Sequence, residues 1–180
     1  MKDYSKTMET ERLLLRKFNF SDADDMFNNY ASHEIVTTFL TWQPHKTIEA
    51  TKMYLSNIVL PDYEKEYTYR WAIVFKETNN VIGCIDVVRK DLDRKRAELG
   101  YVLSDYYWGN GIMPEAGKAV IQYLFEEGFV RIQAIHDIDN PKSGRVMQKI
   151  GMEYEGTLKK FEKCKDGSLR TCKMYAIVKD

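Results

Sequence analysis

Two closely spaced glycines, in the stretch Trp108-Gly109-Asn110-Gly111, stand between a strand-like pattern and a helix-like pattern. Glycine has no Cβ atom, so the backbone can turn sharply and a ligand can approach the peptide N–H groups. A strand, a glycine turn and a helix N-terminus together favour the binding of an anion such as a phosphate. We therefore predict an anion site at the backbone N–H groups of Trp108, Gly109, Asn110, Gly111, Ile112 and Met113.

The glycine spacing excludes two common phosphate-binding loops. No Gly-Lys-Ser or Gly-Lys-Thr follows at the distance of a Walker loop, and the third glycine of a dinucleotide-binding loop would fall on Pro114. A glycine pair is also typical of a hairpin-like loop without a ligand. The residues on either side of the loop decide between these two readings.

Hydrophobic periodicity predicts the two elements that must position the loop. Residues 96–103 alternate in character, which indicates a strand with Glu98 on the face opposite Leu99 and Tyr101. After the loop, apolar residues recur at helical spacing, with Pro114 in the first turn and Gly128 as the stop. Further strands are predicted at 69–75, 81–87 and 130–136, and two more around Asp166-Gly167. Because a helix joins the strand at 96–103 to that at 130–136, these two strands should be parallel.

A second ordered block follows downstream, with Asn140-Pro141-Lys142-Ser143 leading through Val146 and Lys149 to Gly151. This block, the Glu98-Leu99-Gly100-Tyr101 stretch before Trp108-Gly109-Asn110-Gly111, and Thr10-Glu11-Arg12-Leu13 near the start resemble the GNAT superfamily of acetyl-coenzyme A dependent N-acetyltransferases. The resemblance is to its ribosomal-protein N-alpha-acetyltransferase (RimJ/RimL) type. Tyr106 departs from the wider superfamily, in which Gln or Arg often begins the loop motif.

The resemblance implies acetyl-coenzyme A as cosubstrate. In such enzymes the glycine loop holds the pyrophosphate, and the pantetheine arm pairs with exposed backbone groups of the preceding strand, here those of Tyr101, Val102 and Leu103. Asn140 would hydrogen-bond the pantetheine amides or fix its loop, and Lys149 would approach the nucleotide phosphate.

The same resemblance implies catalytic roles for Glu98 and Ser143. Glu98 would act as the base that receives the proton of the acceptor amine, and Ser143 would donate a hydrogen bond to the leaving thiolate. The alternatives are that Glu98 is a surface carboxylate paired with Arg96 or a nearby lysine, and that Ser143 is a helix N-cap. No cysteine falls in the two motif blocks, which favours direct attack within a ternary complex.

The expected fold is α/β (α+β): a GNAT-like, mostly antiparallel central sheet with flanking helices and a splayed parallel strand pair. At 180 residues, the chain suits a single domain over 1–180. The charged stretch from Arg89 to Lys95 is interpreted as a solvated turn.

Composition limits the classes of binding partner and the cellular compartment that the sequence favours. Twenty-seven basic residues balance twenty-seven acidic ones, which favours neither nucleic acid nor a membrane as a partner. The chain has three cysteines, an odd number without C-x-x-C spacing, and this is typical of the reducing cytoplasm. Three scattered histidines offer no metal-ligand spacing, so we expect no metal.

We expect an enzyme that acetylates a primary amine, with the N-terminal alpha-amino group of a protein or peptide as the leading acceptor. A small amine, such as an amino acid, a polyamine or an aminoglycoside, is the alternative acceptor. From another class, the chain would be an acyl-coenzyme A sensing module without catalysis. Either a monomer or a homodimer fits the sequence.

Overall fold

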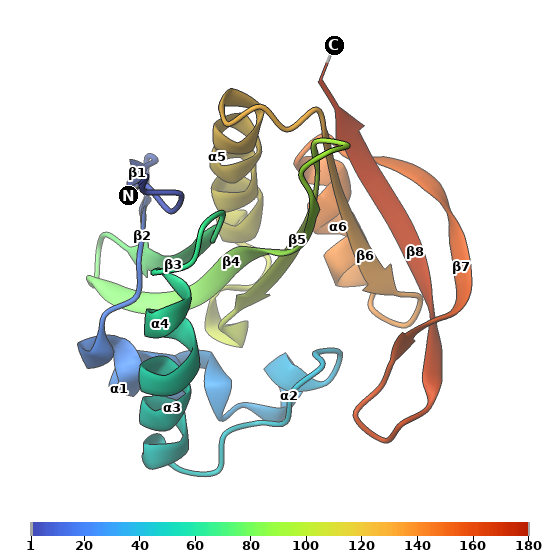
Figure 1. Cartoon of the computed structure of the whole chain (residues 1–180). Coiled ribbons are helices and arrows are strands. Elements are labelled where there is room, and N and C mark those ends of the chain that lie inside the picture. The colour runs from blue at the N-terminus through green and yellow to red at the C-terminus, as the bar shows by residue number, and fades with distance from the viewer. Residues whose placement is uncertain (1, 180) are drawn as a thin grey trace. The chain divides into compact units, whose positions relative to one another are not determined.

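The fold is described from a computed structural model, which covers residues 2–179. Figure 1 shows the elements in chain order. The strands are β1 (Met8–Glu9), β2 (Leu13–Arg16), β3 (Arg70–Phe75), β4 (Asn80–Asp91), β5 (Arg96–Leu103), β6 (Arg131–Asp137), β7 (Glu153–Lys163) and β8 (Leu169–Val178). The longer helices are α3 (Ile48–Tyr54), α5 (Ile112–Glu126) and α6 (Pro141–Lys149). Short helices are η1 (Phe20–Asp22), α1 (Ala23–Met26), η2 (Phe27–Ala31), α2 (Glu34–Thr37), η3 (Leu55–Val59), α4 (Leu60–Asp62) and η4 (Asp105–Tyr107).

The strands form one mixed sheet in the order β1-β2-β3-β4-β5-β6-β8-β7. The pairing of β5 with β6 is parallel, and the pairs β1-β2, β2-β3, β3-β4, β6-β8 and β7-β8 are antiparallel. This confirms the predicted α/β fold, a mostly antiparallel sheet with flanking helices and one parallel pair. Across residues 2–179, each helix is too short or too polar to span a bilayer.

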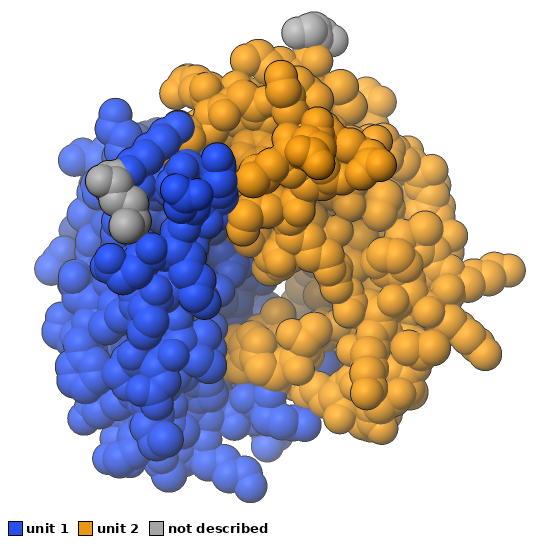
Figure 2. All heavy atoms as spheres, viewed as in Figure 1, with its two compact units in different colours: residues 1–38, 43–86, 101–112 blue, residues 39–42, 87–100, 113–180 orange. Residues whose placement is uncertain are grey.

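The chain divides into two compact units, coloured separately in Figure 2. Unit 1 comprises residues 1–38, 43–86 and 101–112, and unit 2 comprises residues 39–42, 87–100 and 113–180. Strands β4 and β5 contribute residues to both units.

Unit 1 is built on β2, β3 and the first part of β4. Alternation along β2 buries Leu13 and Leu15 completely, and Trp71 and Ile73 on β3 are buried to the same degree. Thr47 is the N-cap of α3, and its hydroxyl accepts a hydrogen bond from the Ala50 N–H.

Unit 2 is built on β6 and β8, with α6 packed on β6. Ile132 and Ala134 are fully buried, as the alternation along residues 130–136 predicts. The apolar face of α5 is buried at Ala116, Val120 and Leu124, which confirms that helical face.

The charged stretch from Arg89 to Lys95 is largely exposed, as expected, but only part of it is a turn. The prediction of a turn is wrong for residues 89–91, because β4 continues to Asp91 and the turn begins only after it. Arg89 therefore lies on a strand, and its side chain is bonded to two carboxylates.

Gly83 on β4 lies where unit 1 leaves no room for a side chain. A Cβ atom at this position would stand 2.4 Å from the Val102 carbonyl oxygen. We expect Gly83→Ala to lower the free energy of unfolding by about 1 to 3 kcal/mol, because the backbone must move to relieve the overlap. Chemical denaturation measures this, with Gly156→Ala as the matched control because its Cβ would meet nothing within 4 Å. Equal stability of the two variants would contradict the close approach.

Candidate functional site

The predicted anion loop lies in unit 1, directly before α5. Gly109 and Gly111 have φ angles of 84° and 75°, in the left-handed region that other residues rarely adopt. Gly109 and Asn110 are exposed, whereas the side chains of Ile112 and Met113 are buried. Ile112 and Met113 are 2% and 4% exposed as whole residues, so the exposed part of the loop is at Gly109 and Asn110. These two positive φ angles and the start of α5 fit the geometry of an anion-binding turn.

Three interactions within unit 1 fix this loop. Arg12 donates from Nη1 to the Asn110 carbonyl oxygen at 2.9 Å. The Trp108 indole N–H donates to the Leu103 carbonyl at 2.9 Å. Before the loop, His33 Nδ1 lies 2.7 Å from Asp105 Oδ1. The loop is therefore anchored at its base and at its tip.

Arg12 is a residue that the sequence interpretation did not include in the site. Its Nη2 atom would lie 3.6 Å from a Cβ atom built on Gly111, so a guanidinium stands beside the glycine turn. The signal was available, since Arg12 belongs to the Thr10-Glu11-Arg12-Leu13 stretch that matches the family pattern. The backbone of Tyr101, Val102 and Leu103 leads into the loop on β5, and the Leu103 carbonyl already accepts the Trp108 bond.

Glu98 lies on β5 in unit 2, and its carboxylate is buried. The residue is 5% exposed. Arg89 donates from Nη1 to Oε1 at 2.6 Å, and Gln133 donates from Nε2 to Oε2 at 2.9 Å. The alternative of a surface carboxylate paired with Arg96 is wrong, because the partner is Arg89 and the group is buried.

Gln133 faces Glu98 because of the strand register. The parallel pairing of β5 with β6 joins Arg96 with Arg131, Ala97 with Ile132 and Glu98 with Gln133. Both strands continue beyond the Glu98–Gln133 pair, to Leu103 and Asp137. Gln133 and Arg89 were missed by the sequence interpretation, since a cross-strand partner is not visible without the register.

The second motif block forms the start of α6 in unit 2. Asn140 is its N-cap, and its side-chain oxygen accepts a bond from the Ser143 N–H at 3.4 Å. Ser143 is therefore not the cap, and that alternative for its hydroxyl is wrong. Lys149 is exposed in the last turn of α6, where a cation complements the negative end of the helix dipole.

The structure brings some of the predicted residues together in two groups, while Glu98 lies on β5 and Lys149 lies in the last turn of α6. Asn140 and Ser143 share one helix start, and the residues from Trp108 to Met113 form one loop and helix start. Within residues 2–179, His, Cys, Asp and Glu side chains are nowhere grouped in threes that could hold a metal ion.

Comparison with known proteins identifies the family. The family model described as "Acetyltransferase (GNAT) domain" matches residues 12–153. This chain therefore belongs to the GNAT acetyltransferase family, which confirms the resemblance at the level of the family and of the enzyme class.

Individual proteins agree with this assignment. The chain is 32% identical to the Bacillus subtilis protein named Uncharacterized N-acetyltransferase YoaA over 174 residues, which is 96% of each chain. It superimposes with a TM-score of 0.81 on an acetyltransferase (GNAT family) from Bacillus anthracis, at 29% identity, covering 96% of this chain and 98% of that one. It also shares its fold, with a TM-score of 0.83 and 21% identity, with RimL, a ribosomal alpha-N-protein acetyltransferase solved in complex with coenzyme A. That alignment covers 96% of this chain and 98% of the other.

Gly111→Val tests the loop. We expect coenzyme A affinity, measured by calorimetry, to fall about tenfold or more, because a branched side chain is strained at this positive φ and crowds the N–H groups. Gly128→Val is the matched control, since Gly128 has a φ of 96° but follows the other end of α5. The control should lose stability and keep its affinity. Equal affinity of the two variants would show that the loop does not take part in binding coenzyme A.

Proposed function

We propose that this chain transfers the acetyl group of acetyl-coenzyme A to a primary amine, and that the leading acceptor is the N-terminal alpha-amino group of a protein or peptide. The observation that carries the proposal is the buried Glu98 carboxylate, held by Arg89 and Gln133. RimJ/RimL-type specificity is part of this proposal. It is supported by the fold shared with RimL and by the motif residues of β5, its loop and α6.

The glycine loop would hold the pyrophosphate through the backbone N–H groups of Trp108 to Met113. Support comes from the two positive φ angles and from the Arg12 guanidinium beside Gly111. Tyr101, Val102 and Leu103 would present backbone groups to the pantetheine arm, Asn140 would bond its amides, and Lys149 would approach the nucleotide phosphate. When bound, the cosubstrate supplies the thioester that the amine attacks.

Glu98 would receive the proton of the incoming ammonium, directly or through water. A carboxylate has about four acceptor positions, and Arg89 and Gln133 take one on each oxygen. The neutral amine then forms the C–N bond as the C–S bond breaks. Ser143, which lies in the first turn of α6, would donate a hydrogen bond to the leaving thiolate.

Transfer would be direct, without an acetyl-cysteine intermediate. Burial raises the pKa of the Cys84 thiol well above its usual range, and burial also raises the pKa of the Cys172 thiol. A raised pKa keeps a thiol protonated at neutral pH, where it is a poor nucleophile. Cys84, Cys164 and Cys172 are all unpaired, which is consistent with a proposed cytoplasmic location.

We further propose that residues 1–180 act as one acetyltransferase domain, since the family match from 12 to 153 includes parts of both units. A small amine remains the alternative acceptor, and an acyl-coenzyme A sensor remains the non-catalytic alternative. A screen of N-terminal peptides, amino acids, polyamines and aminoglycosides with acetyl-coenzyme A, read by mass spectrometry, separates these cases. Tight cofactor binding with no acetylated product would favour the sensor.

The cofactor proposal predicts a selective thermal shift. Coenzyme A and acetyl-coenzyme A should raise the melting temperature, because a ligand that binds only the native state stabilises it by mass action. At a ligand concentration about one hundred times Kd, the gain is about 2.7 kcal/mol. NAD and ATP serve as controls that carry phosphates without pantetheine. Equal shifts in melting temperature with all four compounds would contradict the cofactor proposal.

The catalytic proposal predicts a large, pH-dependent loss in Glu98→Gln. This change keeps the size of the side chain and removes the proton acceptor. Acetyl transfer near pH 7 should fall about 100-fold or more, while coenzyme A affinity stays within a few-fold. The defect should shrink at higher pH, because an acceptor amine with a pKa of about 8 to 10 then deprotonates unaided. A variant with the full wild-type rate would exclude Glu98 from the mechanism.

A further inference from the structure

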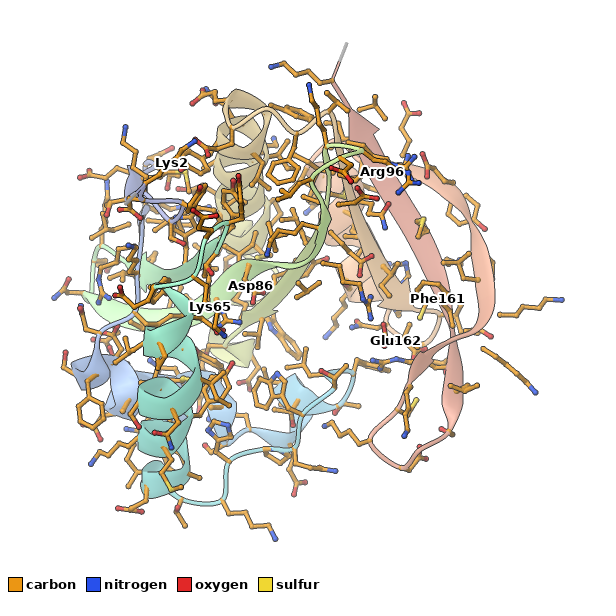
Figure 3. All side chains as sticks on the ribbon, in the orientation of Figure 1. Lys2, Lys65, Asp86, Arg96, Phe161 and Glu162 are labelled. Atoms are coloured by element: carbon orange, nitrogen blue, oxygen red, sulfur yellow. The ribbon has the colours of Figure 1, made fainter. Side chains whose placement is uncertain are left out.

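Glu98 lies at the centre of a hydrogen-bonded network of polar side chains within unit 2. From one end of the network to the other, the bonded side chains are Glu162, Arg89, Glu98, Gln133, Arg131 and Glu155. They come from four strands, β7, β4, β5 and β6. Figure 3 shows Glu162 on β7. The hydrogen bond between Gln133 and Glu98 joins the two halves of this network.

Arg89 connects two carboxylates. Its Nη1 donates to Glu98 Oε1 at 2.6 Å, and its Nη2 donates to Glu162 Oε2 at 2.9 Å. The Arg89 side chain is 54% exposed, whereas the side chains of Glu98 and Glu162 are 6% and 17% exposed. Its hydrogen bond to Glu162 is the main reason that the pKa of Arg89 is raised. Glu162 therefore holds the guanidinium, and the guanidinium holds Glu98.

Gln133 can donate to Glu98 only in one orientation of its amide group. Arg131 donates from Nε to Gln133 Oε1 at 3.2 Å, so that oxygen is an acceptor and Nε2 points to Glu98. Arg131 is fixed in turn by Glu155, which accepts from Nη1 at 2.8 Å and also from Nη2. Glu162 and Glu155, at the two ends of the network, thus constrain the two groups that donate to Glu98.

We propose that Arg89 and Gln133 are positioning residues that hold the Glu98 carboxylate in the orientation needed for proton transfer. This inference rests on the proposed function, because it assumes that Glu98 receives the proton of the acceptor. Hydrogen bonds to an ionised group are stronger than those between neutral groups, and here one such bond holds each carboxylate oxygen. Glu162 anchors Arg89, and Arg131 sets the orientation of Gln133.

The hydrogen bonds around Glu98 show what each substitution removes. Arg89 from β4 is the only cation bonded to Glu98 among the described residues, and Gln133 from β6 is neutral. Glu162 from β7 fixes the other end of the Arg89 guanidinium. Removing the guanidinium leaves one oxygen of Glu98 without its donor, so the carboxylate is held by Gln133 alone. The loss should therefore fall on the rate of the chemical step.

The test compares kcat and KM of Arg89→Met with those of the wild type, measured with one acceptor. We expect kcat to fall about 10- to 100-fold while KM stays within about twofold, because the carboxylate loses its orientation and substrate binding does not change. Arg89→Lys should recover part of the loss in kcat, because an ammonium group can still donate to the carboxylate. An unchanged kcat in Arg89→Met would overturn the inference.

Arg94→Met is the matched control. Arg94 lies near Arg89 in sequence and pairs with Asp91 at 2.8 Å, but its side chain is 68% exposed. Its kcat should stay close to that of the wild type, and a loss equal to that of Arg89→Met would count against a specific role for Arg89. If Arg89→Met fails to fold, Gln133→Leu is measured in the same way, with a smaller loss of kcat expected. An unchanged kcat in that variant would equally reject the inference.

The two proposals fail differently. A wild-type protein that acetylates no amine in the screen would reject the proposed function. A wild-type protein that is active and depends on Glu98, combined with an unchanged kcat in Arg89→Met, would reject only the positioning role.

Discussion

The burial of the Glu98 carboxylate is the constraint on which the rest of this account depends. An ionised carboxylate taken out of water carries a large desolvation cost unless it is paired and hydrogen-bonded. Unit 2 meets this requirement with one guanidinium and one amide, each bonded to a different oxygen. Replacing a buried ion pair by apolar residues is often neutral or stabilising. Stability alone therefore gives no reason to keep a charge at this position.

Backbone register delivers that arrangement. Side chains alternate along β6, so Ile132 and Ala134 are buried on one face while Gln133 lies on the other. Parallel pairing then sets Gln133 opposite Glu98. A slip of one residue would turn Gln133 away from the carboxylate. The apolar residues of β6 thus fix the register, and through the register they fix a polar contact. In unit 1, Arg12 donates a hydrogen bond to the Asn110 carbonyl oxygen, and this bond ties the start of β2 to the glycine loop.

The sequence predicted the elements well and their cross-strand contacts poorly. Local periodicity and turn residues predict the strand, the glycine loop and the helix from residue 96 onward. They also predict the strands at 69–75 and 81–87, and the helix between the strands at 96–103 and 130–136 predicts their parallel pairing. Local signals fail at Arg89, where a run of charges typical of a solvated turn includes the last part of β4. They also fail at Ser143, since the side chain of Asn140, three residues earlier, caps α6. The partners of Glu98 come from residues 9 and 35 positions away in sequence, so only the folded register identifies them.

A double-mutant cycle on kcat/KM at pH 6 tests most directly whether the network acts through Glu98. The four proteins are the wild type, Arg89→Met, Glu98→Gln and the double variant, all assayed with one acceptor. If Arg89 acts only by holding the Glu98 carboxylate, adding Arg89→Met to Glu98→Gln should cause little further loss, and the two single effects should be strongly non-additive. Additive losses in the double variant would contradict the account, because Arg89 would then contribute independently of Glu98.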